Sequence, residues 1–377
     1  MKRILLSLLK IFPVLILISC NVHEWPEEEA ARYEFILNLE YDEQIPFYKE
    51  VYYSRGKEAT RDDFEFYDIR YIVNVYRVAN EDDASREIYC TYIFSRYFEI
   101  EHDYKVTLNL PEGNYRFRIW TDHVNSGVQE DYFYSTSDFS EIKLKMEDGH
   151  KGSNEYRDAF SGTTYGTVID PELYHQRYGK YPSNKATAHM RRPMGRYEFI
   201  STDMDEFLGK TLENLDEQTL RKLMELAASR AKNKNDDTRG DNFWNGLTRD
   251  EVAELIGIDK YKVVFAYNAY MPSTYNLYYD RPSDSSTGVR YESSMSVGKD
   301  GMQLGFDYIL VDDQTIMNLS MSIFNAEGEQ IASTSGVQVP IVRSKNTVVK
   351  GTFLTVTSGG GVGINPDFDG EYNIEIK

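Results

Sequence analysis

The feature that most constrains the fold is an alternation of apolar and polar residues with a period of two. It is clearest in YEFILNLE at 33–40 and in YKVTLNL at 104–110. Such a period places apolar side chains on one face of a β-strand. PEGN at 111–114 separates the second run from another at 115–119, and this spacing predicts a β-hairpin. Further short strands are predicted at 69–75, 142–146, 263–267, 317–323, 347–356 and 372–376.

Many short strands separated by turn residues favour β-sandwiches over alternating strand–helix–strand units. The chain also holds 30 tyrosines and 19 phenylalanines among its 377 residues. Aromatic side chains fit half-buried pleated surfaces, and tyrosine keeps a polar group for the solvent edge. The sequence therefore predicts an all-β protein. Its length predicts two domains, each able to bury its own core.

The pentapeptide RYEFI occurs at 32–36 and again at 196–200. We expect each copy to be the first strand of its own sandwich domain, although five matching residues can also arise by coincidence. Nothing else in the two halves aligns, so a duplication is not inferred from the sequence. A glycine-rich polar stretch at 147–191 predicts a linker. The expected domains are 32–190 and 191–377.

One segment departs from the strand pattern. Residues 214–234 place Leu220, Leu223, Met224 and Ala227 at helical spacing. TRDE at 248–251 has the form of a capping box and predicts a second, short helix, which ends at Gly257. The second domain is therefore expected to carry a small helical insertion near 214–257.

The first nineteen residues predict an export signal. They combine Lys2 and Arg3 with an apolar run that is too short and too interrupted for a good membrane span. LISC at 17–20 resembles the bacterial lipobox, in which the cysteine becomes the first mature residue and carries a diacylglyceryl group through a thioether bond. We therefore predict lipidation of Cys20. The alternative is an ordinary cleaved signal with a cysteine nearby by chance.

Residues 20–31 predict an acidic tether. NVHEWPEEE carries four glutamates, which repel one another and keep such a segment extended. In Bacteroidetes lipoproteins a similar acidic stretch is a signal for export to the cell surface, and this reading stays open. With a net charge of −19, the chain is expected to avoid nucleic acid and to reach the outer membrane through acyl chains rather than a basic patch.

Three motifs are candidates for binding sites. NPDFDG at 365–370 matches the start of an EF-hand loop, but Ile376 stands where a bidentate glutamate is required, so a turn is favoured over a weak calcium site. SGGGVG at 358–363 lacks the residues of a phosphate loop and predicts a hairpin tip. RRPMGR at 191–196 is basic; it is expected to pack as a linker, with docking of an acidic partner as the alternative.

The remaining candidates give no sign of catalysis. The six histidines are dispersed without metal-ligand spacing, and no G-x-S-x-G motif is present. Cys90 has no partner once Cys20 is modified, so it is expected to be a small buried apolar group. We predict no enzyme activity, no cofactor and no metal site.

Several segments in the same order resemble a known family. They are LISCNVHEWPE, LPEGNYRFRIWTD, YRDAFSG, RRPMGRYEFISTD, YNAYMPSTYN and FDYILV, spread from residue 17 to residue 311. These segments are similar to those of the fimbrial anchor and minor-subunit lipoproteins of Bacteroidetes (FimB-like). The resemblance implies two transthyretin-like Greek-key sandwiches. It also implies a surface lipoprotein that anchors or caps a fimbrium and binds shaft or minor subunits by strand addition. Only Cys20 can be carried over as a site residue.

The last predicted strand, Tyr372 to Ile376, bears on this role. If the fold itself needs that strand, the chain is expected to accept a partner's strand rather than to donate one, which suits an anchor better than a shaft unit. The rival hypothesis is a glycan-binding surface lipoprotein. It requires an exposed row of aromatic residues centred on Trp25, Trp120 or Trp244.

Overall fold

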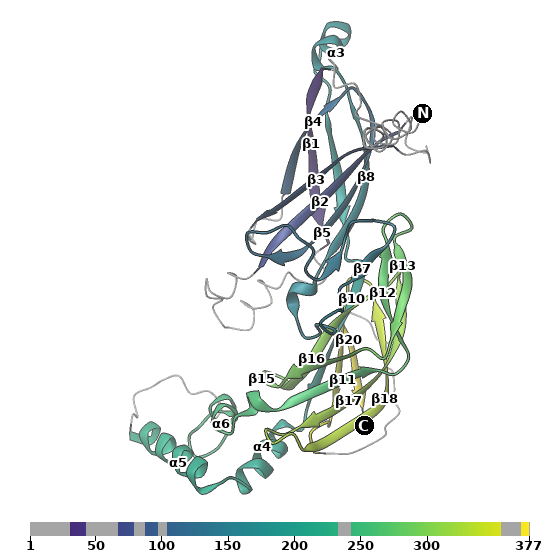
Figure 1. Cartoon of the computed structure of the whole chain (residues 1–377). Helices are drawn as coiled ribbons and strands as arrows, with labels where there is room; N and C mark the ends of the chain where they lie inside the picture. The colour runs from purple at the N-terminus through teal and green to yellow at the C-terminus, as the bar shows by residue number, and fades with distance from the viewer. Residues whose placement is uncertain are drawn as a thin grey trace, which may run out of the picture.

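The computed structural model describes residues 31–42, 67–78, 87–96, 104–232, 243–355 and 371–376. Figure 1 shows an elongated molecule in which two β-sandwiches are stacked end to end, with a group of helices beside the lower one. The protein is all-β apart from these helices and one short helix at the opposite tip. No helix within the described ranges has the length and hydropathy that crossing a bilayer requires.

The first sandwich consists of a three-stranded and a four-stranded sheet. The three-stranded sheet has the order β4 (Tyr104–Pro111), β1 (Arg32–Tyr41) and β9 (Lys185–Met190). The four-stranded sheet has the order β3 (Glu87–Arg96), β2 (Tyr67–Val78), β5 (Gly113–Asn125) and β8 (Phe160–Val168).

Alternating side chains from both sheets fill the space between them. Phe35, Leu37 and Leu39 of β1 are buried, as the period-two pattern predicts. Phe35 stacks on Phe117 of the opposite sheet, with ring centroids 5.0 Å apart. The sequence pattern thus defines the core of this sandwich.

The second sandwich also has two sheets. One has the order β15 (Ser296–Gly298), β16 (Gly301–Leu310), β10 (Met194–Ser201), β19 (Asn346–Gly351) and β20 (Glu371–Ile376). The other has the order β14 (Arg290–Ser294), β11 (Lys262–Tyr267), β17 (Gln314–Phe324) and β18 (Gln330–Val342).

The two sandwiches repeat one topology. The order β4-β1-β9 corresponds to β16-β10-β19, and β3-β2-β5-β8 corresponds to β14-β11-β17-β18. β1 and β10 each pair antiparallel with one neighbour and parallel with the other. The two RYEFI copies therefore occupy the same place, as the first strand of each sandwich. This part of the sequence interpretation is confirmed.

A fifth sheet links the two sandwiches. It has the order β13 (Arg281–Thr287), β12 (Tyr270–Asn276), β7 (Ile142–Leu144) and β6 (Tyr134–Ser135). Ile142 pairs with Tyr275, so a hairpin that precedes β8 in the chain pairs with one that follows β11. The expected domain limits, 32–190 and 191–377, stay a prediction. The hydrogen bonds between β7 and β12 join residues on either side of the expected boundary.

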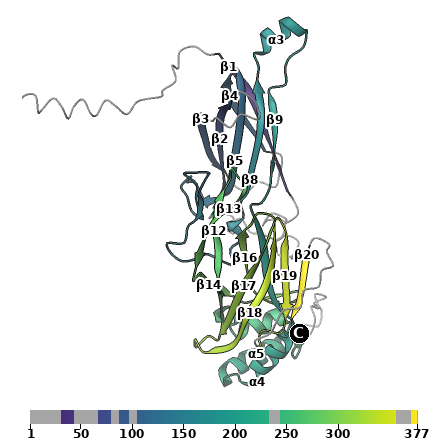
Figure 2. The ribbon, with the colours of Figure 1, turned by 90° about the vertical axis from the view of Figure 1, so that its right-hand side faces the viewer.

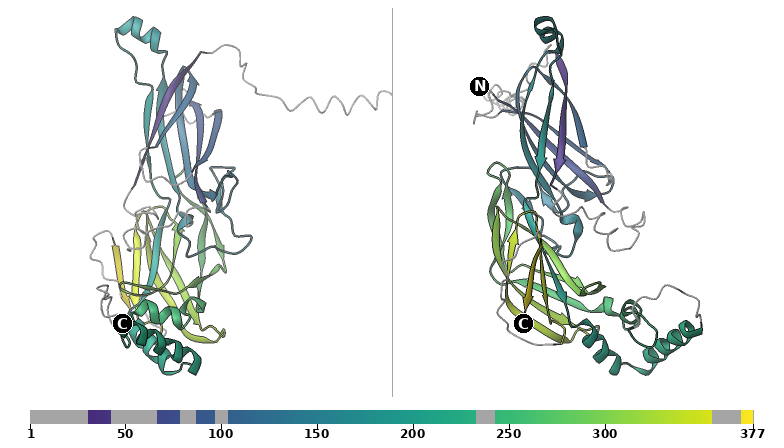
Figure 3. Two further views of the ribbon diagram at one scale, coloured as in Figure 1. Left: turned by 90° about the vertical axis from the view of Figure 1, so that its left-hand side faces the viewer. Right: turned by 180° about the vertical axis from the view of Figure 1, so that it is seen from behind.

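The helical insertion is confirmed, but it begins earlier than predicted. It contains α4 (Met204–Glu213), α5 (Glu217–Lys232) and α6 (Arg249–Leu255), followed by η4 (Ile258–Lys260), and Figure 3 shows it projecting from the second sandwich. Thr248 and Glu251 form the predicted capping box. α4 was missed because its acidic first turn, DMDE, directly follows a strand and resembles a charged loop.

The polar stretch at 147–191 is not a plain linker. It contains η3 (Glu155–Arg157), β8, α3 (Pro171–Tyr178) and β9, and Figure 2 shows α3 at the tip of the first sandwich. Two of its glycines, both in β8, are sites of close approach. A Cβ on Gly166 would lie 2.5 Å from the Phe35 ring, and one on Gly162 would lie 2.5 Å from Met190. Close packing against these residues, rather than a loop, explains Gly162 and Gly166.

Candidate functional site

The one site residue that the sequence predicts, Cys20, lies outside the described residues. The same holds for Trp25, for residues 358–370 and for the side chain of Cys90. What the structure brings together instead is a set of buried charges where the two sandwiches meet. We call it the junction network and define it by Asp307, His150, Arg157 and Tyr267.

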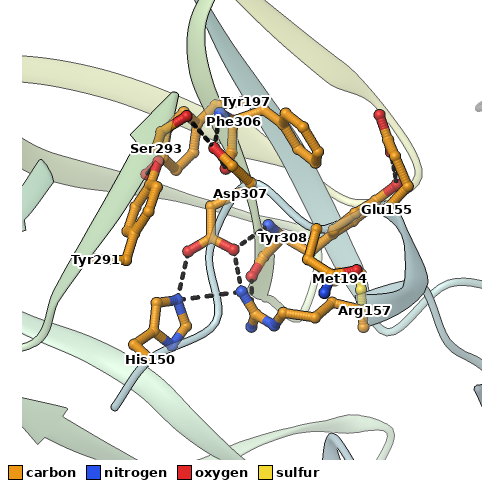
Figure 4. A network of polar contacts seen from close by, with 12 residues as sticks. His150, Glu155, Arg157, Met194, Tyr197, Tyr291, Ser293, Phe306, Asp307 and Tyr308 are labelled. Atoms are coloured by element: carbon orange, nitrogen blue, oxygen red, sulfur yellow. Dashed lines mark hydrogen bonds and ion pairs between the residues drawn. The ribbon is translucent and has the colours of Figure 1, made fainter. Parts of the chain in front are cut away.

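Asp307 of β16 is at the centre of the junction network (Figure 4). Its Oδ2 accepts hydrogen bonds from His150 Nε2 and from the Tyr267 hydroxyl, both at 2.5 Å. Its Oδ1 accepts from Arg157 Nη1 and from the backbone N–H of Tyr308, the latter at 2.8 Å. The carboxylate is 1% exposed, so these four donors replace its hydration.

Two of these partners come from one connecting segment, residues 145–159, which joins β7 to β8. The backbone ties this segment to β16 as well: Ser153 N–H donates to the Phe306 carbonyl at 2.8 Å, and the Ser153 hydroxyl contacts that of Ser293 at 2.8 Å. A Cβ on Gly152 would lie 2.3 Å from the Tyr291 ring, so only glycine fits there. The connecting segment is thus fixed against the second sandwich by both backbone and side chains.

Three tyrosines continue the junction network into the core of the second sandwich. The Tyr197 hydroxyl lies 2.9 Å from that of Tyr267 and 3.0 Å from that of Tyr291. Burial, together with the neighbouring hydroxyls and Asp307, raises the pKa of each well above its ordinary value. They stay protonated at neutral pH, so Tyr267 can donate to Asp307.

The charge at the centre is negative. Burial acts to raise the pKa of Asp307, but Arg157 and His150 outweigh it and hold the pKa at about 2. The carboxylate has no proton to give, so His150 Nε2 must carry the proton that they share. Burial lowers the pKa of His150, and the repulsion of Arg157 acts in the same direction, against the attraction of Asp307. His150 is therefore neutral at pH 7.

Two of the three arginines of the basic cluster RRPMGR, Arg192 and Arg196, are buried at this junction, and Arg191 is exposed. Arg192 Nε and Nη2 donate to Asp158, each at 2.8 Å to its nearer oxygen. Arg196 pairs with Glu155 at 3.1 Å and with Glu198 at 2.7 Å. These two guanidinium groups are therefore engaged within the chain, as expected for a packed linker.

A further buried pair lies in the first sandwich. Arg70 binds Asp122 through two hydrogen bonds of 2.9 and 2.6 Å, and it contacts Asp131 at 2.8 Å. Trp120 donates its indole N–H to Asp122 at 3.1 Å. Sequence reasoning missed these pairs because the partners are far apart in the chain and no local pattern marks them.

The contacts of this site join the connecting segment to the second sandwich. Its carboxylates are paired with arginines, and its tyrosines donate to them. The described residues contain no group of three histidine, cysteine, aspartate or glutamate side chains that could hold a metal ion. The expectation that the chain is not an enzyme stays a prediction.

The aromatic residues named for glycan binding lie elsewhere than expected. Trp120 is fully buried beneath Tyr134, and Trp244 packs against the small core of the helical insertion. Trp120 therefore cannot be the centre of an exposed aromatic row, whereas Trp244 is half-buried.

The sheet edges differ between the two sandwiches. β15 covers the outer side of β16, whereas no strand in the described part of the chain pairs with the outer side of the corresponding strand, β4. β4 is paired along its whole length with β1, from Tyr104 to Pro111. Its buried and exposed side chains alternate. Such an edge presents unpaired backbone groups to an incoming strand.

We expect Asp307→Asn to destabilise the protein strongly. The amide leaves Arg157 buried without a counter-charge, which costs about 3–5 kcal/mol when a buried pair is broken in this way. Chemical denaturation measures the loss. Asp300→Asn is the control, since the Asp300 side chain is 56% exposed beside Lys350, and it is expected to cost less than about 1 kcal/mol. Equal losses for both variants would contradict a special role for Asp307.

We expect stability to decrease below about pH 6.5 because of His150. The unfolded chain binds a proton on this imidazole near its ordinary pKa of 6.5, whereas the folded chain binds it only at lower pH. Below pH 6.5 the unfolded state therefore holds more protons, and stability falls by up to about 1.4 kcal/mol per pH unit. Chemical denaturation at pH 7 and pH 5 should show that the stability of His150→Gln depends less on pH than that of the wild type. This variant keeps a hydrogen-bond donor for Asp307.

The control for this pH dependence is His189→Gln. The side chain of His189 is 79% exposed, beside Glu40. This variant compares the loss of an exposed imidazole with the loss of the buried one. A His150→Gln profile that coincides with the wild type would show that this imidazole does not titrate differently on folding.

Comparison with known proteins gives matches to solved structures. The fimbrial anchor protein Mfa2 from Porphyromonas gingivalis is 11% identical, with a TM-score of 0.35, over 80% of this chain and 82% of that chain. A candidate adhesin from Bacteroides ovatus is 11% identical, with a TM-score of 0.37, over 80% and 77%. A candidate polysaccharide-binding protein from Bacteroides thetaiotaomicron is 10% identical, with a TM-score of 0.35, over 79% of each chain.

No curated protein matches the sequence. One family model, described as "Family of unknown function (DUF6562)", matches residues 26–377. The match spans almost the entire chain, and the protein belongs to this family.

Proposed function

We propose that this protein is a cell-surface lipoprotein that holds or caps a fimbrium at the outer membrane. In this proposal, acyl chains on Cys20 attach it to the membrane, and a pilus subunit binds by adding a strand to its first sandwich. The observation that carries the proposal is the outer edge of β4, with which no strand pairs in the described ranges, whereas its counterpart β16 is covered by β15.

The composition of β4 suits this role. Val106, Leu108 and Leu110 point into the core and fix the strand in place. Lys105, Thr107 and Asn109 are exposed on the other face. An added strand would gain its affinity from the backbone hydrogen bonds of β4 and its specificity from such alternating side chains. β20 already pairs with β19 in its own sheet, which favours accepting a strand over donating one.

The junction network supports a fixed arrangement of the two sandwiches. A protein that holds a filament at a membrane must keep its two sandwiches from unfolding or swivelling under force. Buried ion pairs connect residues from 150 to 158 with residues from 192 to 307, and separating them would expose uncompensated charges. We also propose that the two sandwiches are the two domains, 32–190 and 191–377, coupled through this network.

The anchoring step predicts the behaviour of Cys20→Ala. Without the thiol no thioether can form, so nearly all of the protein should move from the membrane fraction to the soluble fraction. Immunoblotting of fractionated cells measures this. Cys90→Ala is the control, since it removes the other cysteine and should stay with membranes. A Cys20→Ala variant that remains membrane-bound would refute lipid anchoring.

The strand-addition step predicts a change in hydrogen exchange at β4. When shaft subunits of the same organism bind, the amides at 105–110 that face away from β1 should exchange more slowly, by up to about tenfold. Each of these amides gains a hydrogen bond, which is worth about 1 kcal/mol. β13 is the control, since it is also an edge strand. Binding that protects β13 and not β4 would move the acceptor site elsewhere.

A further inference from the structure

Exposed apolar side chains gather at one tip of the molecule. In the part of the chain that the structure describes, eight large apolar residues are prominently exposed, and three of them lie within nine positions: Leu173 at 61%, Tyr178 at 57% and Tyr181 at 61%. They belong to α3 and to the turn after it, which project beyond the end of the first sandwich (Figures 1 and 2). We call residues 170–185 the tip.

The tip is ordered although it buries none of its helical residues. An isolated helix of eight residues is unstable in water, so local contacts must hold it. Asp170 caps its start by accepting from the backbone N–H groups of Glu172 and Leu173, and Gly179 ends it in the left-handed conformation. His175 stacks on Tyr181 with ring centroids 4.4 Å apart. The apolar groups are thus presented on a preformed support.

The tip lies where the chain enters the fold. Tyr33 is the second residue of β1, and its hydroxyl donates to Asp170 Oδ2 at 2.5 Å. Tyr33 follows Cys20 by thirteen residues, which span at most about 45 Å when fully extended. Acyl chains on Cys20 would therefore keep the membrane close to this end of the molecule rather than to the helical insertion at the other.

The charge of the tip differs from that of the whole chain. The tip contains Arg177, Lys180 and Lys185 against Asp170 and Glu172, a net charge of +1 in a protein of net charge −19, and its two carboxylates both lie at the start of α3. A local excess of positive charge beside exposed tyrosine and leucine is the combination that favours an anionic membrane interface. Tyrosine in particular is enriched at the level of the lipid head groups.

We propose that the tip inserts Leu173, Tyr178 and Tyr181 into the interface of an anionic lipid membrane. This inference rests on the proposed lipidation of Cys20 and adds a second point of attachment. A chain held only by an extended tether could rotate freely. With the tip bound as well, the long axis of the molecule stands away from the membrane and directs the second sandwich outward.

The test uses the full-length lipidated protein on vesicles of phosphatidylcholine and phosphatidylglycerol that contain brominated lipid, which quenches nearby tryptophan. Trp25→Phe is introduced throughout, because Trp25 lies in the tether. Leu173→Trp reports on the tip. Tyr279→Trp is the matched control, since Tyr279 is equally exposed, at 72%, but far from the tip. We expect strong quenching and a blue shift for Leu173→Trp and little change for Tyr279→Trp.

The outcomes separate the two proposals. If the protein floats with vesicles but Leu173→Trp is quenched no more than Tyr279→Trp, the tip proposal is overturned and lipid anchoring stands. If the protein with an intact Cys20 does not float at all, both fail. Adding Arg177→Glu and Lys180→Glu to the Leu173→Trp protein should reduce the quenching. Unchanged quenching would show that charge attraction does not contribute to the binding of the tip to the membrane.

Discussion

The ion pair between Asp307 and Arg157 makes the two sandwiches depend on each other. A buried carboxylate is stable only where donors replace its lost hydration, and two of its side-chain partners come from the connecting segment that precedes β8. The polar centre of the second sandwich is therefore incomplete without residues 145–159. The hairpin of β6 and β7 makes the same connection through hydrogen bonds with β12. Side chains and backbone thus couple the same two parts of the chain.

How far the sequence predicts this structure depends on the distance between interacting residues. Alternation located β1 and β4, and the capping box located α6, because those signals are local. β8 was hidden because Gly162 and Gly166 are needed for close contact with Met190 and Phe35 and so interrupt the pattern. The junction network has no local signal at all. Asp307 looks like any polar residue of a strand until His150 and Arg157, about 150 positions earlier, are placed beside it.

The repeated topology explains how two dissimilar halves can have different tasks. The strand order of a sandwich is fixed by which faces are apolar and by short connections, and many sequences satisfy both. The additions are free to vary. In the second sandwich, β15 and β20 extend the sheet that contains β10, while the corresponding sheet around β1 has three strands among the described residues. Strands can thus be added at the edges of one sandwich without a change in the common strand order.

Force transmission connects these features. If the membrane holds one end and a filament strand lies along β4, tension passes through the first sandwich along strands that are loaded in shear. In that arrangement the junction network keeps the second sandwich from swinging into the path of the filament. Its charges are costly to separate because water would have to replace four donors around Asp307 at once. An apolar contact would slide under load, whereas directional hydrogen bonds to a buried carboxylate resist displacement in every direction.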